Sequence, residues 1–133
     1  MLIAKMYLEN LLSVDKLHYK EIKIINDLYD LVKKNNKKKI DKKLDELVKD
    51  VEHHFETEER QMFEYNFPWV YKHQFVHECA LQTLYEKRDE WKETKDKSLI
   101  KKYLEKQLLP WFNAHVMTLD RVACDFLVTH WSN

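Results

Sequence analysis

The sequence predicts an all-α protein, an up-down-up-down four-helix bundle, and two observations lead to this prediction. The first is composition: the 133 residues contain no glycine and only two prolines, whereas tight hairpins and β-bulges usually need glycine. The second is periodicity, because four successive segments repeat apolar residues at steps of three and four, as amphipathic helices do. Short polar stretches separate the segments, and helices joined in this way pack antiparallel around one core.

The helix boundaries and turns follow from this pattern. The helices are expected over residues 13–34, 38–65, 68–93 and 98–130. Asn66 is expected to end the second helix in the left-handed conformation, and Pro68 to open the third. Pro110 predicts a kink in the fourth helix, because a proline removes one backbone hydrogen bond. The basic stretch of residues 33–39 is predicted to be a solvated turn, with a docking site for an anionic partner as the alternative.

The charge balance excludes some classes of function. Lys+Arg and Asp+Glu number 23 each, so no net charge favours nucleic acid or an anionic membrane as a partner. Residues 1–133 are expected to form one domain, with a short N-terminal arm (1–12) and the bundle (13–130). The apolar run of the arm is too short to span a bilayer and lacks the cleavage site of a signal peptide. We therefore expect a soluble, cytoplasmic protein, and a monomer.

The two cysteines, Cys79 and Cys124, form no Cys-x-x-Cys motif. We expect both to be reduced, buried thiols, as in a cytosolic protein. Cys124 lies one turn beyond Asp120 on the same helix face, so redox coupling to the site described next is the alternative for that residue.

Seven groups of metal-ligating type fall on the core-facing sides of the predicted helices. They are His18 on the first helix, His54 and Glu58 on the second, His73 and His77 on the third, and His115 and Asp120 on the fourth. Residues four apart on a helix face the same way. A carboxylate on an apolar face costs several kcal/mol unless it is paired or bound to a metal ion. The pattern therefore predicts a metal site in the core.

Other polar residues nearby are predicted to have no such role. Glu56, Glu59 and Arg60 fall off the apolar stripe of the second helix, so we expect them to be solvated. His53 is also off the stripe, and His130 lies near a helix end.

The donor set indicates which metals fit. Imidazole and carboxylate groups without thiolates argue against zinc–thiolate and iron–sulfur sites, and suit iron, zinc, manganese or copper. Seven groups exceed one tetrahedral zinc site, which favours two metal ions. None of the seven histidines follows a glutamate by three positions, unlike the Glu-x-x-His motifs of carboxylate-rich di-iron proteins. The imidazole-rich set favours reversible binding of a ligand at the metal ions over oxidation chemistry.

The motifs resemble the complete ligand set of the hemerythrin family. They are His18, His54-Phe-x-x-Glu58-Glu-x-x-Met62, His73-x-x-x-His77 and His115-x-x-x-x-Asp120, in that order. The resemblance covers residues 18–126, and residues 14–18 and 109–115 are most similar to bacterial members. The sequence departs from the family in lacking a glycine before Pro68 and in having an altered N-terminal arm.

The resemblance implies a role for each of the seven ligands. His73, His77 and His115 would bind one iron ion, and His18 and His54 the other. Glu58 and Asp120 would bridge the two iron ions together with an oxo or hydroxo group. Phe55, Trp111, Phe112 and Leu119 are candidates to line an apolar O2 pocket beside this di-iron centre.

The activity that the resemblance implies is reversible O2 binding, in oxygen storage, delivery or sensing, by a protein that is not an enzyme. The alternative is a di-iron redox enzyme, or a protective protein, that acts on peroxide, nitric oxide or damaged iron centres. A third interpretation is a structural or interaction protein whose site is vestigial or holds zinc. A separate redox or O2-consuming protein partner is left open.

Overall fold

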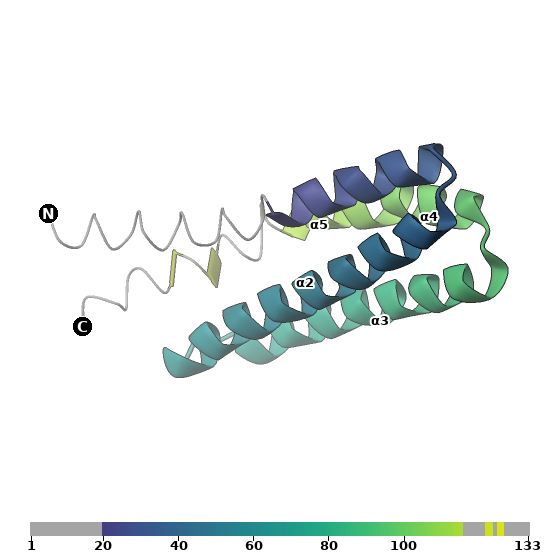
Figure 1. Cartoon of the computed structure of the whole chain (residues 1–133). Coiled ribbons are helices and arrows are strands. Elements are labelled where there is room, and N and C mark those ends of the chain that lie inside the picture. Colours follow the sequence, from purple (N-terminus) through teal and green to yellow (C-terminus); the bar gives the residue numbers. More distant parts are fainter. Residues whose placement is uncertain (1–19, 116–121, 124, 127–133) are drawn as a thin grey trace, which may run out of the picture.

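The computed structural model describes residues 20–115, 122–123 and 125–126, and it confirms the helical fold class. Helical residues 20–33 come first, followed by α2 (Lys37–Glu64), α3 (Val70–Thr94), α4 (Lys97–Tyr103), the π-helical η1 (Leu104–Leu108) and α5 (Leu109–His115). The last three elements follow one another without a break and form one helical rod. The chain reverses direction between successive rods, as an up-down-up-down bundle requires (Figure 1). The predicted N-terminal arm, residues 1–12, lies outside the described residues.

The turns between helices depend on asparagine and lysine instead of glycine. The Asn36 side chain caps α2 by accepting a hydrogen bond from the backbone N–H of Lys39, over 3.2 Å. Asn35, Asn66 and Lys95 have positive φ angles of 60°, 57° and 53°, so the prediction for Asn66 is confirmed. Asparagine tolerates this conformation better than most residues with a Cβ.

Two predictions about the turns can be compared with the structure. Helix α3 begins at Val70, so Pro68 lies in the preceding turn and does not open the helix. The lysines in residues 33–39 are all exposed as predicted, but the turn itself covers only residues 34–36, because α2 begins at Lys37.

A π-helical turn, η1, lies just before Pro110, where the sequence predicted a kink. In η1 the backbone N–H of Leu109 bonds to the carbonyl of Leu104, five residues back. Such turns occur as single bulges inside α-helices. The helix then continues through Pro110 to His115, so the proline does not end it.

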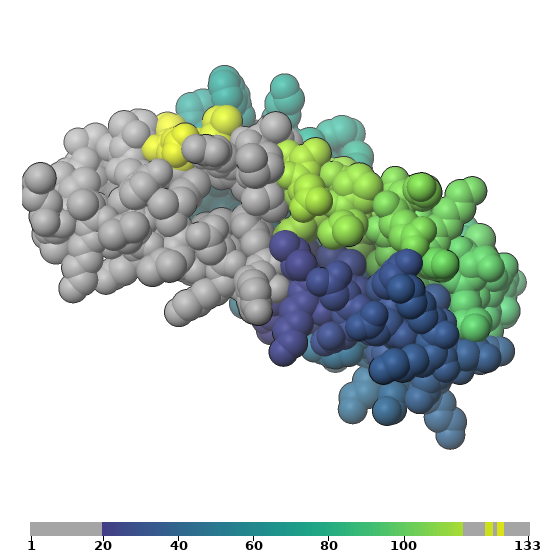
Figure 2. Space-filling view, turned by 90° about the horizontal axis from the view of Figure 1, so that it is seen from above, coloured from purple at the N-terminus to yellow at the C-terminus, as the bar shows by residue number. Residues whose placement is uncertain are grey.

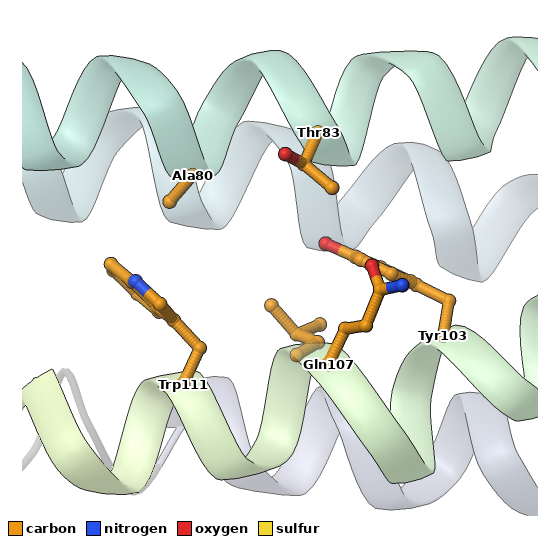
Figure 3. Close-up of a pocket in the computed structure, with 6 residues that line it drawn as sticks. Ala80, Thr83, Tyr103, Gln107 and Trp111 are labelled. Atoms are coloured by element: carbon orange, nitrogen blue, oxygen red, sulfur yellow. The ribbon is translucent and has the colours of Figure 1, made fainter.

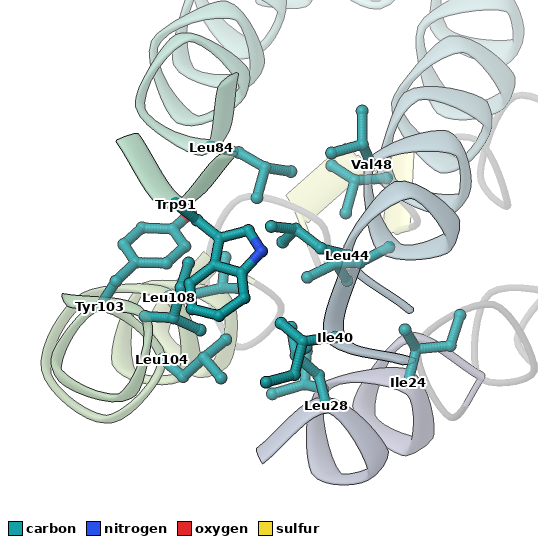
Figure 4. Close-up of a cluster of buried hydrophobic side chains, with 14 of the residues drawn as sticks. Ile24, Leu28, Ile40, Leu44, Val48, Leu84, Trp91, Tyr103, Leu104 and Leu108 are labelled. Carbon is teal, nitrogen blue, oxygen red and sulfur yellow. The ribbon is translucent and has the colours of Figure 1, made fainter. Parts of the chain in front are cut away.

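A continuous apolar core fills the half of the bundle that holds the turns at residues 34–36 and 95–96 (Figure 4). Helix 20–33 contributes Ile24 and Leu28, and α2 contributes Ile40 and Leu44. Trp91 of α3 is 0% exposed, and the last helical rod covers it with the buried residues Ile100, Tyr103, Leu104 and Leu108. Removal of this apolar area from water stabilises the bundle.

Polar contacts at the rim hold the same helices together. The indole N–H of Trp91 donates to Asp41 over 2.6 Å, and the Lys95 ammonium donates to the same carboxylate over 2.8 Å. The Tyr29 hydroxyl donates to the Glu105 carboxylate, which joins helix 20–33 to the last rod. These two helices lie side by side on one face of the molecule (Figure 2).

We predict that Trp91→Ala lowers the free energy of unfolding by about 3–5 kcal/mol, because it leaves a cavity at a fully buried position. Urea unfolding followed by circular dichroism measures the change. Trp69→Ala is the matched control, since Trp69 is 61% exposed and its loss should cost less than about 0.5 kcal/mol. Equal losses in the two variants would contradict the core position of Trp91.

Candidate metal centre

Four predicted ligands converge on one point in the interior. Glu58 comes from α2, His73 and His77 from α3, and His115 from α5, and one ligand atom of each lies within 4.8 Å of all the others. The Nε2 atom of His115 is 3.2 Å from that of His73 and 3.1 Å from that of His77. The three histidines are between 1% and 4% exposed. The structure thus brings together four of the residues that the sequence predicted as ligands.

The geometry fits a single cation among these groups. Ligand nitrogens lie about 2.0–2.1 Å from a zinc-like ion, so neighbouring ligand atoms around such an ion are about 3.0–3.4 Å apart. The separations from the His115 Nε2 atom fall in this range. One shared proton satisfies only one pair of nitrogens, whereas a bound cation accepts a lone pair from all three. The residues present therefore fit a metal ion.

The Glu58 carboxylate lies between this cluster and a further histidine. Its Oε1 atom is 2.6 Å from Nε2 of His54. Its Oε2 atom is 3.3 Å from Nε2 of His77 and 3.7 Å from Nε2 of His73. Its two oxygens thus face His54 on one side and the histidine cluster on the other, which is the arrangement that a bridging carboxylate needs.

Glu21 is a functional residue that the sequence analysis missed. It is 1% exposed, and its Oε2 atom lies 2.5 Å from Nδ1 of His54. A carboxylate behind a ligating histidine fixes the tautomer and the ring orientation, so that Nε2 points at the metal. Glu21 lies four residues before the buried Ile25, so its position on the apolar stripe was the available signal.

The two carboxylates on either side of His54 dominate its electrostatics. Burial on its own would lower the pKa of His54, but hydrogen bonds to Glu21 and Glu58 raise that pKa to about 10. His77 has the opposite behaviour, since burial lowers its pKa despite the nearby Glu58. The cluster thus favours a neutral His77, which is the form that binds a metal ion.

Glu59 is only partly solvated, so its predicted solvation is too high. Its side chain is only 17% exposed, and its Oε2 atom lies 3.7 Å from Nδ1 of His77. Burial raises the pKa of Glu59. Glu59 therefore lies near the back of His77 but makes no hydrogen bond to its Nδ1 atom, unlike Glu21 behind His54.

Aromatic rings hold the imidazoles in place. Phe55 stacks on His77 with ring centroids 3.8 Å apart and 2° between the ring planes. Trp111 stacks on His115 at 4.6 Å and 13°. Phe112 meets His54 edge-on at 6.4 Å. Three of the four predicted pocket residues therefore contact the site, and their rings keep water away from it.

Comparison with known proteins agrees with this geometry. The family model described as the Hemerythrin HHE cation binding domain matches residues 13–124. The chain belongs to the hemerythrin family. It is similar to the curated protein named Bacteriohemerythrin from Aquifex aeolicus (strain VF5), with 35% identity over 109 residues. The match covers 82% of this chain and 83% of that protein.

Some of the residues that the sequence analysis discussed cannot be placed. His18, Asp120 and the pocket candidate Leu119 lie outside the described residues, as do Cys124 and His130. The structure therefore places five of the seven predicted ligands, and all five belong to the site described above.

The prediction of a buried Cys79 is wrong, because its side chain is exposed. It follows the ligand His77 by two positions on α3, which turns it by about 200° to the outer face of the helix. His53 is exposed, as its position off the stripe predicted. Within the described part of this hemerythrin-family chain, no helix is long and apolar enough to cross a membrane.

A pocket of about 150 Å³ reaches the metal centre at His73. Its other lining residues are Phe67, Trp69, Lys72 and Val122. His73 therefore lies between the buried cluster and this pocket.

We predict that Glu21→Ala lowers metal affinity by about 10–100-fold, because His54 loses the carboxylate that fixes its ring. Competition with a chelator of known affinity measures the change. Glu56→Ala is the control, since Glu56 lies on the same helix as His54 but is exposed. If both variants bound metal as the parent does, the role of Glu21 would be disproved.

Proposed function

We propose that this chain binds O2 reversibly at a di-iron centre. The observation that carries the proposal is the position of Glu58, whose two carboxylate oxygens face His54 on one side and His77 on the other. A carboxylate shared in this way suits two metal ions better than one. Membership of the hemerythrin family and the similarity to a protein named Bacteriohemerythrin support the same assignment.

The proposed ligand sets follow from this position. His73, His77 and His115 would hold one iron ion, and His54 the other, together with His18. Glu58 and Asp120 would bridge the ions, with an oxo or hydroxo group between them. When bound, the iron pair supplies the reversible electron transfer that O2 binding requires.

The residues around the site favour release of O2 over its consumption. Neutral imidazoles donate less negative charge to a metal than carboxylates do, so an imidazole-rich set disfavours highly oxidised iron. Phe55 and Phe112 are 1% and 2% exposed, and they exclude water together with Trp111. Apolar surroundings of this kind would supply few protons for the reduction of O2. These features support a carrier, and they suit oxygen storage, delivery or sensing equally.

Absorption spectroscopy tests the proposal directly. The protein is reduced without oxygen, and its spectrum is recorded before and after air is added, with iron counted per chain. A coloured form that appears with O2 and disappears on its removal, at two irons per chain, is the expected result. Direct passage to a stable oxidised form would instead support the redox enzyme, and a sample that held only zinc would support the structural interpretation.

We predict that Glu58→Ala loses at least one of the two iron ions, because both groups of imidazoles lose their shared carboxylate. Elemental analysis of the purified variant measures the iron per chain. His53→Ala is the control, since His53 lies on the same helix but is exposed, and it should keep its iron and its spectrum. Two irons per chain in Glu58→Ala would count against the bridging role.

A further inference from the structure

A second pocket, of about 170 Å³, lies between α3 and the last helical rod (Figure 3). Its lining residues are Ala80 and Thr83 from α3, and Tyr103, Gln107, Leu108 and Trp111 from the opposite helix. None of them belongs to the predicted metal ligands. The Trp111 indole forms the wall nearest to the metal centre, since it also stacks on His115.

The pocket combines apolar walls with one buried polar group. Tyr103 is 3% exposed, and its hydroxyl points between the two helices towards Thr83 (Figure 3). Among the described residues, this hydroxyl makes no hydrogen bond. The hydroxyl oxygen is not one of the fully enclosed polar atoms, and Tyr103 lines the pocket, so the hydroxyl offers a hydrogen bond to whatever enters it.

The remaining polar groups at the pocket are neutral. The Thr83 hydroxyl donates to the backbone carbonyl of Cys79 over 3.2 Å, so only its lone pairs face a ligand. Burial raises the pKa of Tyr103, so its hydroxyl stays protonated at neutral pH. No lining residue of this pocket carries a formal charge, and the walls therefore favour a neutral ligand over an ion.

The backbone beside the pocket is irregular. Gln107 and Leu108 belong to the π-helical η1, and Tyr103 immediately precedes it. Single π-helical turns inside α-helices occur frequently at functional sites. The irregular turn thus coincides with one wall of the pocket.

We propose that this pocket binds a small neutral molecule that has an apolar body and one hydrogen-bonding group. The body would pack against Trp111, Leu108 and Ala80, and the polar group would pair with the Tyr103 hydroxyl. A cavity of this size accommodates a single aromatic ring, since an engineered cavity of about 150 Å³ in another protein binds benzene. The proposal does not depend on O2 binding at the metal centre.

Fluorine NMR on the full-length, metal-loaded chain tests the proposal with two probes of similar size. 4-Fluorophenol carries a hydroxyl group, and fluorobenzene does not. We expect both to bind, with 4-fluorophenol the tighter. Tyr103→Phe should lower the affinity for 4-fluorophenol by about five- to tenfold, which is the loss expected for one hydrogen bond. The affinity for fluorobenzene should stay within about twofold of that of the parent protein. Tyr71→Phe is the control, since Tyr71 is 73% exposed and lies outside the pocket.

A second variant tests the location. Ala80→Leu should abolish binding of both probes, because the larger side chain fills the pocket, while helical content and metal content report that the variant folds. The proposal is overturned if neither probe binds the parent protein, or if Ala80→Leu binds them as the parent does. An equal loss of affinity for both probes in Tyr103→Phe would overturn the role of the hydroxyl. The same titrations on metal-free protein separate this site from the metal centre.

Discussion

Three imidazole nitrogens face one another in the buried interior of the bundle. The Nε2 atoms of His73 and His77 lie 3.2 and 3.1 Å from that of His115, with the Glu58 carboxylate beside them. Lone pairs held this close in a dry interior are unfavourable unless a proton or a metal ion lies between them. The apolar core in the other half of the bundle offsets this cost, because it keeps the helices packed while the ligand groups remain in position.

Groups around the imidazoles of the site orient two of the rings. Glu21 lies 2.5 Å from Nδ1 of His54, which turns the Nε2 atom of that ring inward. Phe55 stacks on His77 from the side. A ring that is fixed by a carboxylate at its back or an aromatic face beside it cannot rotate freely. These contacts orient the rings of His54 and His77 towards the site.

Helical periodicity predicted more of this structure than residue chemistry did. The apolar stripe predicted a helix over 38–65, and α2 spans Lys37–Glu64. The agreement is close because the spacing of apolar residues at three and four positions depends only on which face of the helix is buried. Glu21 also lies on such a stripe, but no histidine lies four residues from it on its own helix, and its partner His54 belongs to α2. Glu59 lies at the edge of the stripe, where burial depends on how closely α3 approaches, and that is a tertiary property. Cys79 was misplaced because the usual burial of cysteine was given more weight than its outward position on the helix.

The last helical rod links the two halves of the bundle through η1. A π-helical turn adds one residue to a turn of helix, which rotates the residues after it by about 100° relative to those before it. Tyr103 faces the apolar core before this turn, and His115 faces the metal cluster after it. A regular helix would turn His115 away from its present direction if Tyr103 were held in place. The same turn therefore aims the ligand at the cluster and forms the wall of the second pocket, which explains why Trp111 borders both.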